Sequence, residues 1–234
     1  MVSSATIHNK SDFTGMRKAG QLAAEILDMI TEHVKPGVTT ETLDTKCFEF
    51  ADQNGACIAP LFYKGFPKSV CTSINHVICH GIPSPRVLED GDIVNIDVTV
   101  IVDGWHGDTS RMYRVGNINN KAQKLIDCTY EAMMLGINEI APNKKTGDIG
   151  NAIQVHAEKN YYSVVEDYCG HGIGNIYHEE PQILHFGKPG TGIEVKEGMC
   201  FTIEPMINQG SKYSKVLSDG WTVETKDGRN SAQW

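Results

Sequence analysis

Two segments of the chain, about a hundred residues apart, each place a carboxylate at the same point of the same local pattern. Residues 88–97 read Leu-Glu-Asp-Gly-Asp-Ile-Val-Asn-Ile-Asp, and residues 195–204 read Val-Lys-Glu-Gly-Met-Cys-Phe-Thr-Ile-Glu. Each is an acidic turn with a glycine, followed by an apolar, strand-like run that ends in Asp97 or Glu204. Because an unpaired carboxylate is costly inside such a run, the two acids predict a site for a cation.

The Asp-Gly turn at 103–104 brings a third carboxylate beside the first of these acids. A two-residue hairpin loop pairs residue 102 with 105, and therefore 99 with 108 and 97 with 110. Asp108 then lies opposite Thr99, on the face of the strand that carries Asp97, and is a diagonal neighbour of Asp97. Two like charges at this spacing need a cation between them.

One imidazole is available to complete the set of ligands. His171 lies in the run Cys-Gly-His-Gly-Ile-Gly, residues 169–174, where glycines let the backbone approach a crowded centre. Carboxylates with a single imidazole suit Mn, Fe, Co or Zn, and the residue types do not choose among them. Taken singly, each acid is more often a solvated surface residue and Gly-His-Gly more often a plain turn. The predicted metal site therefore rests on the combination.

The apolar periodicity predicts the elements that must position these residues. Helical spacing of apolar residues alternates along the chain with strand-like runs, several of which end at Asp-Gly turns. This order predicts an α+β fold in which four helices cover one face of a mostly antiparallel sheet. The predicted helices are 16–34, 40–54, 119–141 and 146–160, and the predicted strands are 69–79, 92–102, 107–115, 163–169, 199–207 and 215–225.

The similarity of the two acidic segments extends to the helices, which indicates an internal repeat. A shift of 106 residues places Pro36 on Pro142 and Thr40 on Thr146, and the offset holds to within one residue at the acids. We therefore expect one catalytic domain, residues 1–234, made of two halves at about 10–115 and 116–234.

Composition excludes several classes of function. The 234 residues are 40% hydrophobic, and 21 Lys and Arg stand against 29 Asp and Glu, a net charge of −8. No basic run long enough to follow a phosphate backbone is present, so we expect no nucleic-acid partner. The sequence also lacks a signal-peptide pattern and a long apolar run, which predicts a cytoplasmic protein without a membrane span. Seven cysteines without a CxxC pair favour neither a disulfide framework nor a structural zinc site.

Along its whole length the chain resembles the type I methionine aminopeptidases, metal-dependent enzymes of the pita-bread fold. No single motif carries this resemblance, but together the motifs are specific. The pseudo-twofold of that fold agrees with the internal repeat. The matching stretches are residues 68–75, 79–83, 95–97, 107–110, 170–174 and 201–205.

The resemblance implies a role for each matching residue. It implies two divalent ions, Co, Mn, Fe or Zn, with Asp108 as a bridge and with His171 and Glu204 on the second ion. Glu204 would also act as general base, His178 would stabilise the oxyanion and His80 would contact the scissile peptide. The implied metal ligands are Asp97, Asp108, His171 and Glu204; the implied walls of a methionine pocket are Tyr63, Phe66, Cys71, Tyr177 and Trp221; the implied monovalent-cation site is Asn75, Val77 and Ser231.

The chain departs from the family at its end. In the family, Ser-Ala-Gln-Trp is followed at once by the fifth ligand, a bridging glutamate, whereas this chain stops at Trp234. The Asp-Gly turn at 227–228 predicts a hairpin whose second strand begins near Arg229 and would stop after about five residues. We therefore expect that the sequence is truncated. Glu224 is a poor substitute, because the simple register of that hairpin pairs it with Ser231.

The resemblance also implies the reaction and its partners. We expect removal of the initiator methionine from nascent proteins and peptides with a small second residue, by a monomer with the ribosome as a transient partner. Two alternatives stay open. One is a peptidase of the same fold with another specificity, such as a prolidase relative. The other is a non-catalytic peptide- or protein-binding member of the fold, because the fifth ligand is missing.

Overall fold

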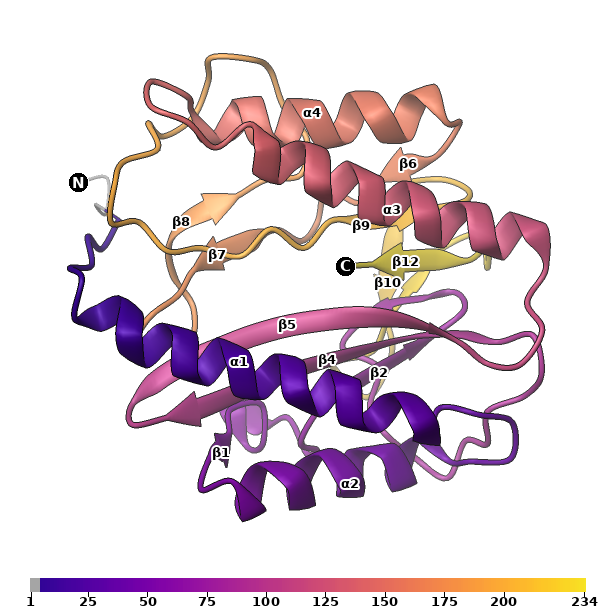
Figure 1. Ribbon diagram of the computed structural model, residues 1–234. Helices are drawn as coiled ribbons and strands as arrows, with labels where there is room; N and C mark the ends of the chain where they lie inside the picture. Colours follow the sequence, from indigo (N-terminus) through magenta and orange to yellow (C-terminus); the bar gives the residue numbers. More distant parts are fainter. Residues whose placement is uncertain (1–4) are drawn as a thin grey trace.

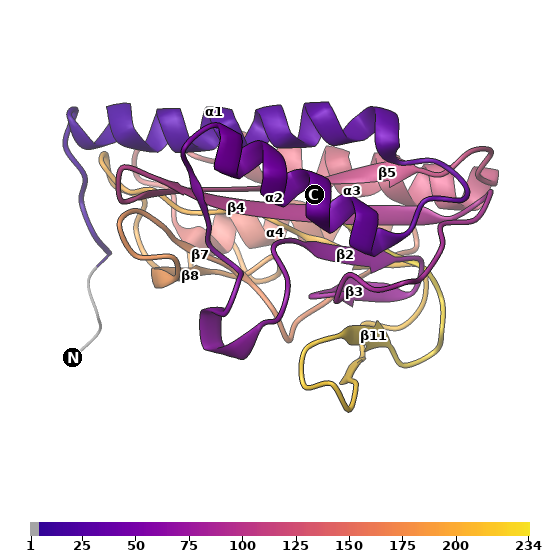
Figure 2. The same ribbon diagram turned by 90° about the horizontal axis from the view of Figure 1, so that it is seen from below.

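The computed structural model describes residues 5–234 and confirms the predicted α+β architecture (Figure 1). Four helices lie on one side of the molecule, and the strands lie behind them (Figure 1). In Figure 2 helix α1 runs along the top edge, with the strands beneath it. The helices are α1 (Asp12–Ile30), α2 (Thr40–Gln53), α3 (Asn120–Asn138) and α4 (Thr146–Lys159), with short 3-10 turns η1 (Thr31–His33) and η2 (Tyr63–Gly65).

Polar side chains set where the helices begin. Thr39 Oγ1 accepts the N–H of Thr42 at the start of α2, at 3.1 Å. Asn119 Oδ1 accepts the N–H groups of Lys121 and Ala122 at the start of α3, at 3.0 and 2.9 Å. These contacts satisfy backbone donors that have no partner inside a helix.

The predicted helices agree closely with the observed ones. Those at 40–54 and 146–160 are confirmed to within one residue at each end. The helix predicted at 16–34 begins earlier, at Asp12, because Asp12 Oδ2 accepts the N–H of Asn9 and closes the turn before it. The helix predicted at 119–141 ends at Asn138.

The helices form two matching pairs. The first helix of each pair, α1 or α3, has 19 residues, and the second, α2 or α4, has 14. These equal lengths support two repeated halves at 10–115 and 116–234 within a single domain. The repeat and the single domain 1–234 stay predictions, and residues 1–4 lie outside the described part of the chain.

A long antiparallel hairpin, β4 (Ile93–Val102) with β5 (Trp105–Arg114), crosses the centre of the molecule. Its predicted register is confirmed, because Thr99 lies opposite Asp108 and the pairs 97–110 and 102–105 form as expected. Asp97 and Asp108 therefore share a face of the sheet. Two short strands, β1 (Cys57–Ile58) and β2 (Cys71–Ile74), pair with β4 and complete this sheet.

The remaining strands form three smaller antiparallel sheets, so the single sheet that we predicted is wrong in extent. The predicted strands 69–79 and 215–225 are each interrupted by a turn and contribute two short strands. The sheets are β10 (Ser214–Val216), β11 (Val223–Thr225) and β3 (Val77–Cys79); β12 (Ser231–Gln233), β9 (Met206–Asn208) and β6 (Ser163–Val164); and β7 (Gly170–Gly172) with β8 (Glu179–Ile183).

The predicted strand 199–207 begins only at Met206, and Glu204 lies in the irregular segment before it. The backbone N–H of Glu204 donates to His185 Nε2, at 3.2 Å, rather than to a neighbouring strand. Pro205 has no N–H to donate. The His185 side chain and Pro205 therefore take the place of the hydrogen bonds to a neighbouring strand that the sequence pattern predicted.

The hairpin predicted across 227–228 is also wrong. Strand β12 pairs with β9, with Ser231 opposite Asn208, and not with the segment before the turn. Glu224 lies opposite Lys215 and Val77 instead of Ser231. Its side chain pairs with Lys215 and His76, away from the predicted metal ligands, so it is not a substitute ligand.

Two apolar cores lie between the helices and the strands. One lies between α1, α2 and β4 and includes Ile26, Leu43 and Val98, which have no exposed surface. The other lies between α3, α4 and the strands β9 and β12, and includes Leu125 and Ile153. The first core packs α1 and α2 on β4, which carries Asp97, and the second packs α3 and α4 on β9, which follows Glu204, and on β12, which carries Gln233.

Gly107 lets helix α1 pack directly on strand β5, one residue before Asp108. A Cβ atom at Gly107 would lie 2.3 Å from the carbonyl carbon of Ala19, which is backbone and cannot move aside. Gly107→Ala is therefore expected to lower the free energy of unfolding by about 1–3 kcal/mol, measured by urea denaturation. Gly20→Ala, in the same helix with open space around it, is expected to be neutral or stabilising by up to about 1 kcal/mol. Equal losses in both variants would contradict this packing.

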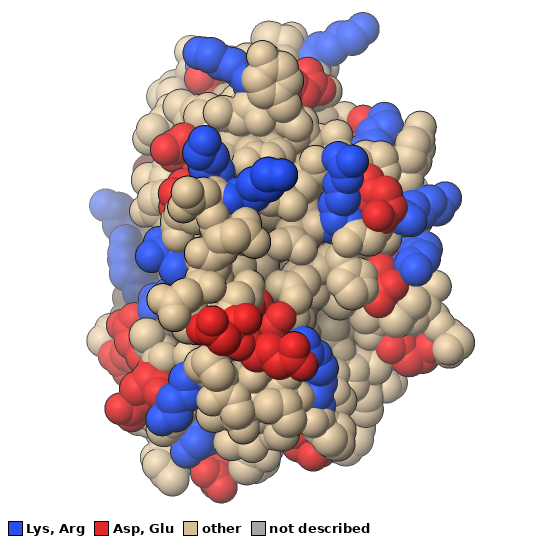
Figure 3. Space-filling view, turned by 90° about the vertical axis from the view of Figure 1, so that its right-hand side faces the viewer, with Lys and Arg blue, Asp and Glu red and all other residues tan. Residues whose placement is uncertain are grey.

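Acidic and basic side chains are interspersed on the face that Figure 3 shows, where a red patch of Asp and Glu is flanked by separate Lys and Arg side chains. That face offers no continuous basic surface (Figure 3). The absence of a nucleic-acid partner stays a prediction. None of the helices between residues 5 and 234 is long and apolar enough to cross a membrane.

Candidate metal centre and active site

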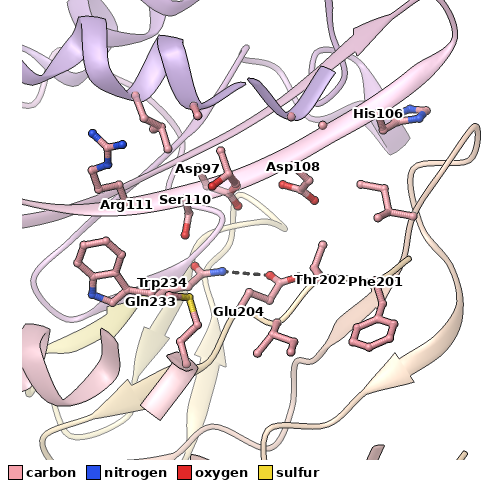
Figure 4. A pocket seen from close by; sticks show the side chains of 18 of the residues that line it. Asp97, His106, Asp108, Ser110, Arg111, Phe201, Thr202, Glu204, Gln233 and Trp234 are labelled. Atoms are coloured by element: carbon pink, nitrogen blue, oxygen red, sulfur yellow. Dashed lines mark hydrogen bonds between the residues drawn. The ribbon is translucent and has the colours of Figure 1, made fainter. Parts of the chain in front are cut away.

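Four predicted ligands from three separate parts of the fold meet at one place. Figure 4 shows Asp97 and Asp108 projecting from the central hairpin, with Glu204 facing them across the pocket. His171, on β7, places Nε2 3.4 Å from Asp108 Oδ2 and 3.6 Å from Glu204 Oε1. Two atoms that each bind one ion at about 2.1 Å lie about 3.0–3.5 Å apart at octahedral or tetrahedral angles. The distance from His171 to Asp108 lies within this range, and the distance from His171 to Glu204 lies just above it.

Hydrogen bonds orient the ligands from outside. His171 Nδ1–H donates to the carbonyl of Gly172 at 3.0 Å, which leaves Nε2 free to accept an ion. Thr202 Oγ1 donates to Glu204 Oε1 at 2.6 Å, and Gln233 Nε2 donates to Glu204 Oε2 at 3.1 Å, the dashed line in Figure 4. Thr99 donates to Asp108 in the same way, Oγ1 to Oδ1, at 2.8 Å. Each such contact fixes a ligand before an ion arrives.

The electrostatics of this cluster favour a cation. Burial raises the pKa of Asp97 well above its ordinary value, and the charges of Asp108 and Glu204 add to the rise. Burial and the charge of Asp108 also raise the pKa of Glu204 to about 7. Burial lowers the pKa of His171, but its contacts with Asp108 and Glu204 outweigh burial and raise it overall. Three carboxylates are thus compensated by one imidazole.

The donor set fits divalent metal ions. It offers carboxylate oxygens and one imidazole nitrogen, the chemistry that Mn, Fe, Co and Zn share. Among residues 5–234, no group of three His, Cys, Asp or Glu side chains has the spacing of a ready-made metal cluster.

The raised pKa of Glu204 predicts how pH affects the metal-free protein. Between about pH 4.5 and 7 the folded chain holds a proton on Glu204 that the unfolded chain has released, so the free energy of unfolding falls as pH rises. With a chelator, we expect Glu204→Gln to raise the melting temperature more at pH 7.5 than at pH 5. Divalent ions should stabilise the unaltered protein more at pH 7.5, because binding displaces protons. Thermal melts at both pH values test this, and a pH-independent difference between the two proteins would contradict it.

The three carboxylates separate two cavities. One cavity, of about 480 Å³, is bounded by α1, α3 and Trp234 and is the pocket of Figure 4. The other, of about 300 Å³, lies on the opposite side of the acids. Asp97, Asp108 and Glu204 line both. The smaller cavity contains every predicted pocket residue, namely Tyr63, Phe66, Cys71, Tyr177 and Trp221, together with His80 and His178.

The walls of the smaller cavity are aromatic and sulfur-bearing. Phe66 and Trp221 meet edge to face at 5.2 Å, and Tyr63 packs on Tyr177 at 4.9 Å, between ring centroids. Such a surface suits a flexible apolar group or a thioether. Cys79, Tyr168 and Met206 also line it and were not predicted, because each has the sequence environment of an ordinary core residue.

Both predicted substrate-contacting histidines border the smaller cavity. The ring of His80 meets the rings of Tyr168 and Trp221 edge to face, at 5.6 and 6.1 Å, and burial lowers its pKa. His178 lies 4.2 Å from His171 between ring centroids, and burial and the charge of His171 lower its pKa. Both rings are neutral at pH 7.

The structure brings together two of the three residues predicted to bind a monovalent cation. Ser231 N–H donates to the Asn75 carbonyl at 2.8 Å, and Asn75 has a left-handed backbone, with φ 54°. Val77 is two residues further, in β3. The cation itself stays a prediction.

Sequence reasoning missed the residues that support the ligands. Thr99 and Thr202 each lie two residues from a ligand, Asp97 or Glu204, and a period-2 search for hydroxyls would have found them. His185 is fully buried behind Glu204, and nothing local in the sequence marks it.

The four predicted ligands lie beside a cavity large enough for a peptide side chain. This arrangement can hydrolyse a peptide bond with metal assistance, which is the chemistry of metallopeptidases.

The comparisons with known proteins agree with this class. The model of metallopeptidase family M24 matches residues 14–228. Methionine aminopeptidase of Rickettsia prowazekii (strain Madrid E) is 60% identical over 230 residues, which are 97% of this chain and 88% of that protein. That of Escherichia coli (strain K12) is 50% identical over 231 residues, 98% of this chain and 88% of that protein. A crystal structure of the Rickettsia prowazekii enzyme superimposes with a TM-score of 0.97 and 59% identity, over 98% of this chain and 93% of that one.

The chain belongs to metallopeptidase family M24, in its methionine aminopeptidase branch. The predicted pita-bread fold is confirmed by the same comparisons. Membership in this family implies use of a divalent metal.

Proposed function

We propose that the protein is an aminopeptidase that removes the N-terminal methionine from peptides and nascent proteins whose second residue is small. The observation that carries the proposal is the junction of Asp97, Asp108, His171 and Glu204 with a cavity of aromatic and sulfur-bearing walls. The residues for cleavage and those for methionine recognition therefore line the same cavity. The high identity to methionine aminopeptidases supports the same reaction.

The four ligands would hold two divalent ions. When bound, such ions lower the pKa of water and polarise the peptide carbonyl. Glu204 would accept the proton of the attacking water, since its pKa is raised toward 7, where a base works best near neutral pH. It would then return that proton to the leaving amine.

The neutral histidines would act on the peptide. A neutral ring can donate an N–H to an oxygen without bringing a charge that repels an ion. We assign His178 to the carbonyl oxygen that gains negative charge, and His80 to the scissile peptide group. Both border the cavity that the methionine side chain would fill.

Specificity for methionine follows from the shape of the smaller cavity. Tyr63, Phe66, Cys71, Tyr177 and Trp221 present ring faces and sulfur to a linear thioether. Each methylene of an apolar side chain adds only about 1–3 kcal/mol of discrimination, so branched side chains must be excluded by shape.

The test is release of free methionine from the peptide Met-Ala-Ser, with Mn or Co added after removal of adventitious metal. We expect release that depends on metal, little release from Leu-Ala-Ser, and less when the second residue is valine. Binding of Met-Ala-Ser without metal-dependent cleavage would favour the non-catalytic binding protein instead.

Several finer features belong to this proposal. We infer a cytoplasmic monomer that meets nascent chains at the ribosome, and a monovalent cation beside Asn75, Val77 and Ser231. The identity and number of the divalent ions are part of the same inference. Metal analysis of the active protein, with sedimentation, would test them.

A further inference from the structure

We propose that Tyr63 is a positioning residue that fixes the tautomer of His178, so that the ring nitrogen left free, Nε2, carries the proton. The inference rests on the proposed function in one respect, the role of His178 as a hydrogen-bond donor to the substrate. The tautomer itself can be measured independently of any reaction.

One hydrogen bond joins the two side chains. Tyr63 OH lies 3.1 Å from His178 Nδ1. Their rings stack at 5.2 Å between centroids, with 24° between the planes. A neutral imidazole has one N–H donor and one acceptor nitrogen, so whichever role Nδ1 takes, Nε2 takes the other.

The surroundings of Tyr63 favour the phenol as the donor. Lys64 Nζ lies over the Tyr63 ring, 5.2 Å from its centroid. A cation on that face withdraws electron density from the ring and makes the hydroxyl hydrogen a better donor. An imidazole nitrogen with a free lone pair is in turn a good acceptor. Tyr63 O–H therefore donates to Nδ1, and Nε2–H is left to face a substrate.

The loop that carries Tyr63 is built to hold it in place. Phe62 and Lys64, on either side, have left-handed backbones with φ 65° and 49°, a conformation that is costly for side chains of this size. Phe62 N–H donates to the Phe66 carbonyl at 2.8 Å, and Gly65 N–H donates back to the Phe62 carbonyl at 3.1 Å. A closed loop of this kind leaves the Tyr63 ring little freedom.

Tyr177 connects the stacked rings of Tyr63 and His178 to the predicted metal centre. Its ring lies 4.9 Å from that of Tyr63 and 4.1 Å from that of His178, between centroids. Its hydroxyl lies 2.8 Å from Thr99 Oγ1. Because Thr99 gives its single proton to Asp108, Tyr177 must be the donor in this contact. One oriented chain of hydrogen bonds thus runs from Tyr177 to a predicted ligand beneath the stacked rings.

The first test is spectroscopic and uses the zinc-loaded 234-residue protein labelled with ¹⁵N-histidine. Subtraction of the His178→Ala spectrum identifies the His178 signals. We expect Nδ1 to show the shift of an unprotonated nitrogen and Nε2 that of a protonated one, with averaging of the two in Tyr63→Phe. A protonated Nδ1 in the unaltered protein would overturn the proposal, whether or not the protein releases methionine.

The second test is kinetic and separates positioning from a plain role as a pocket wall. Tyr63→Phe keeps the ring, so KM for Met-Ala-Ser should stay within about twofold while kcat falls about tenfold, the value of one oriented hydrogen bond. In a His178→Ala background the same change should have no further effect on kcat. Tyr213→Phe is the matched control, since Lys226 covers its ring but it borders neither cavity. An equal kcat loss in both backgrounds, or a rise in KM alone, would refute the positioning role.

Discussion

A protein with one glutamate appended after Trp234 is expected to bind divalent ions more tightly, and to release methionine more than about 100-fold faster, than the 234-residue chain. Side chains alternate along a strand. Gln233 faces the acids and donates to Glu204 at 3.1 Å, whereas Trp234 faces α3 and donates Nε1–H to the Ile126 carbonyl at 3.2 Å. An appended residue that continues β12 would therefore point, like Gln233, at the acids.

The matched control is an appended glutamine, which has the same size without the charge. Calorimetry with Mn, together with methionine release, should separate the two. If the charge of the appended residue is what matters, only glutamate should raise both the affinity for Mn and the rate of methionine release. If glutamine works equally well, the longer strand is what the site needs, and if neither changes the rate, four ligands suffice.

Asp97→Asn is expected to reduce metal-dependent methionine release by more than about 100-fold while leaving the protein folded. Loss of groups that merely support a metal ligand costs 10–100-fold, so loss of a ligand should cost at least as much. The metal-free variant should be as stable as the unaltered protein or more stable, because the pKa of Asp97 is raised by burial and by its acidic neighbours.

Asp103→Asn serves as the control for this prediction. Asp103 lies in the same hairpin but is exposed, and its only ion pair in the described structure is with Lys18, at 2.7 Å. Release rates and thermal melts of both variants should be compared with and without Mn. Equal rates for Asp97→Asn and the unaltered protein would remove Asp97 from the site.

The central part of this site could be predicted because it depends on local geometry. A two-residue turn at 103–104 fixes the register of β4 and β5, and that register alone places Asp108 beside Asp97. The helices could be predicted equally well, since the apolar periodicity and the caps that define them are local features of the sequence. The resemblance to a family supplied the roles of His80 and His178, which spacing alone could not.

The rest depends on contacts between distant segments. Glu204 was expected in a strand, but His185 and Pro205 take the place of ladder hydrogen bonds there. The hairpin expected at 227–228 failed because β12 finds its partner in β9. No local pattern reveals which of several possible partners a short strand will choose.

The distribution of the ligands between the halves bears on how such a chain could have arisen. Asp97 and Asp108 belong to the predicted first half, and His171 and Glu204 to the second. Strand β3 of the first half also pairs with β11 of the second. Under the predicted duplication only Asp97 and Glu204 occupy equivalent positions, whereas the same offset places Asp108 on Lys215 and His171 on Lys64. An ancestral chain of half this length would therefore have carried one of these ligand positions per copy, and a symmetric dimer would have brought two such carboxylates together.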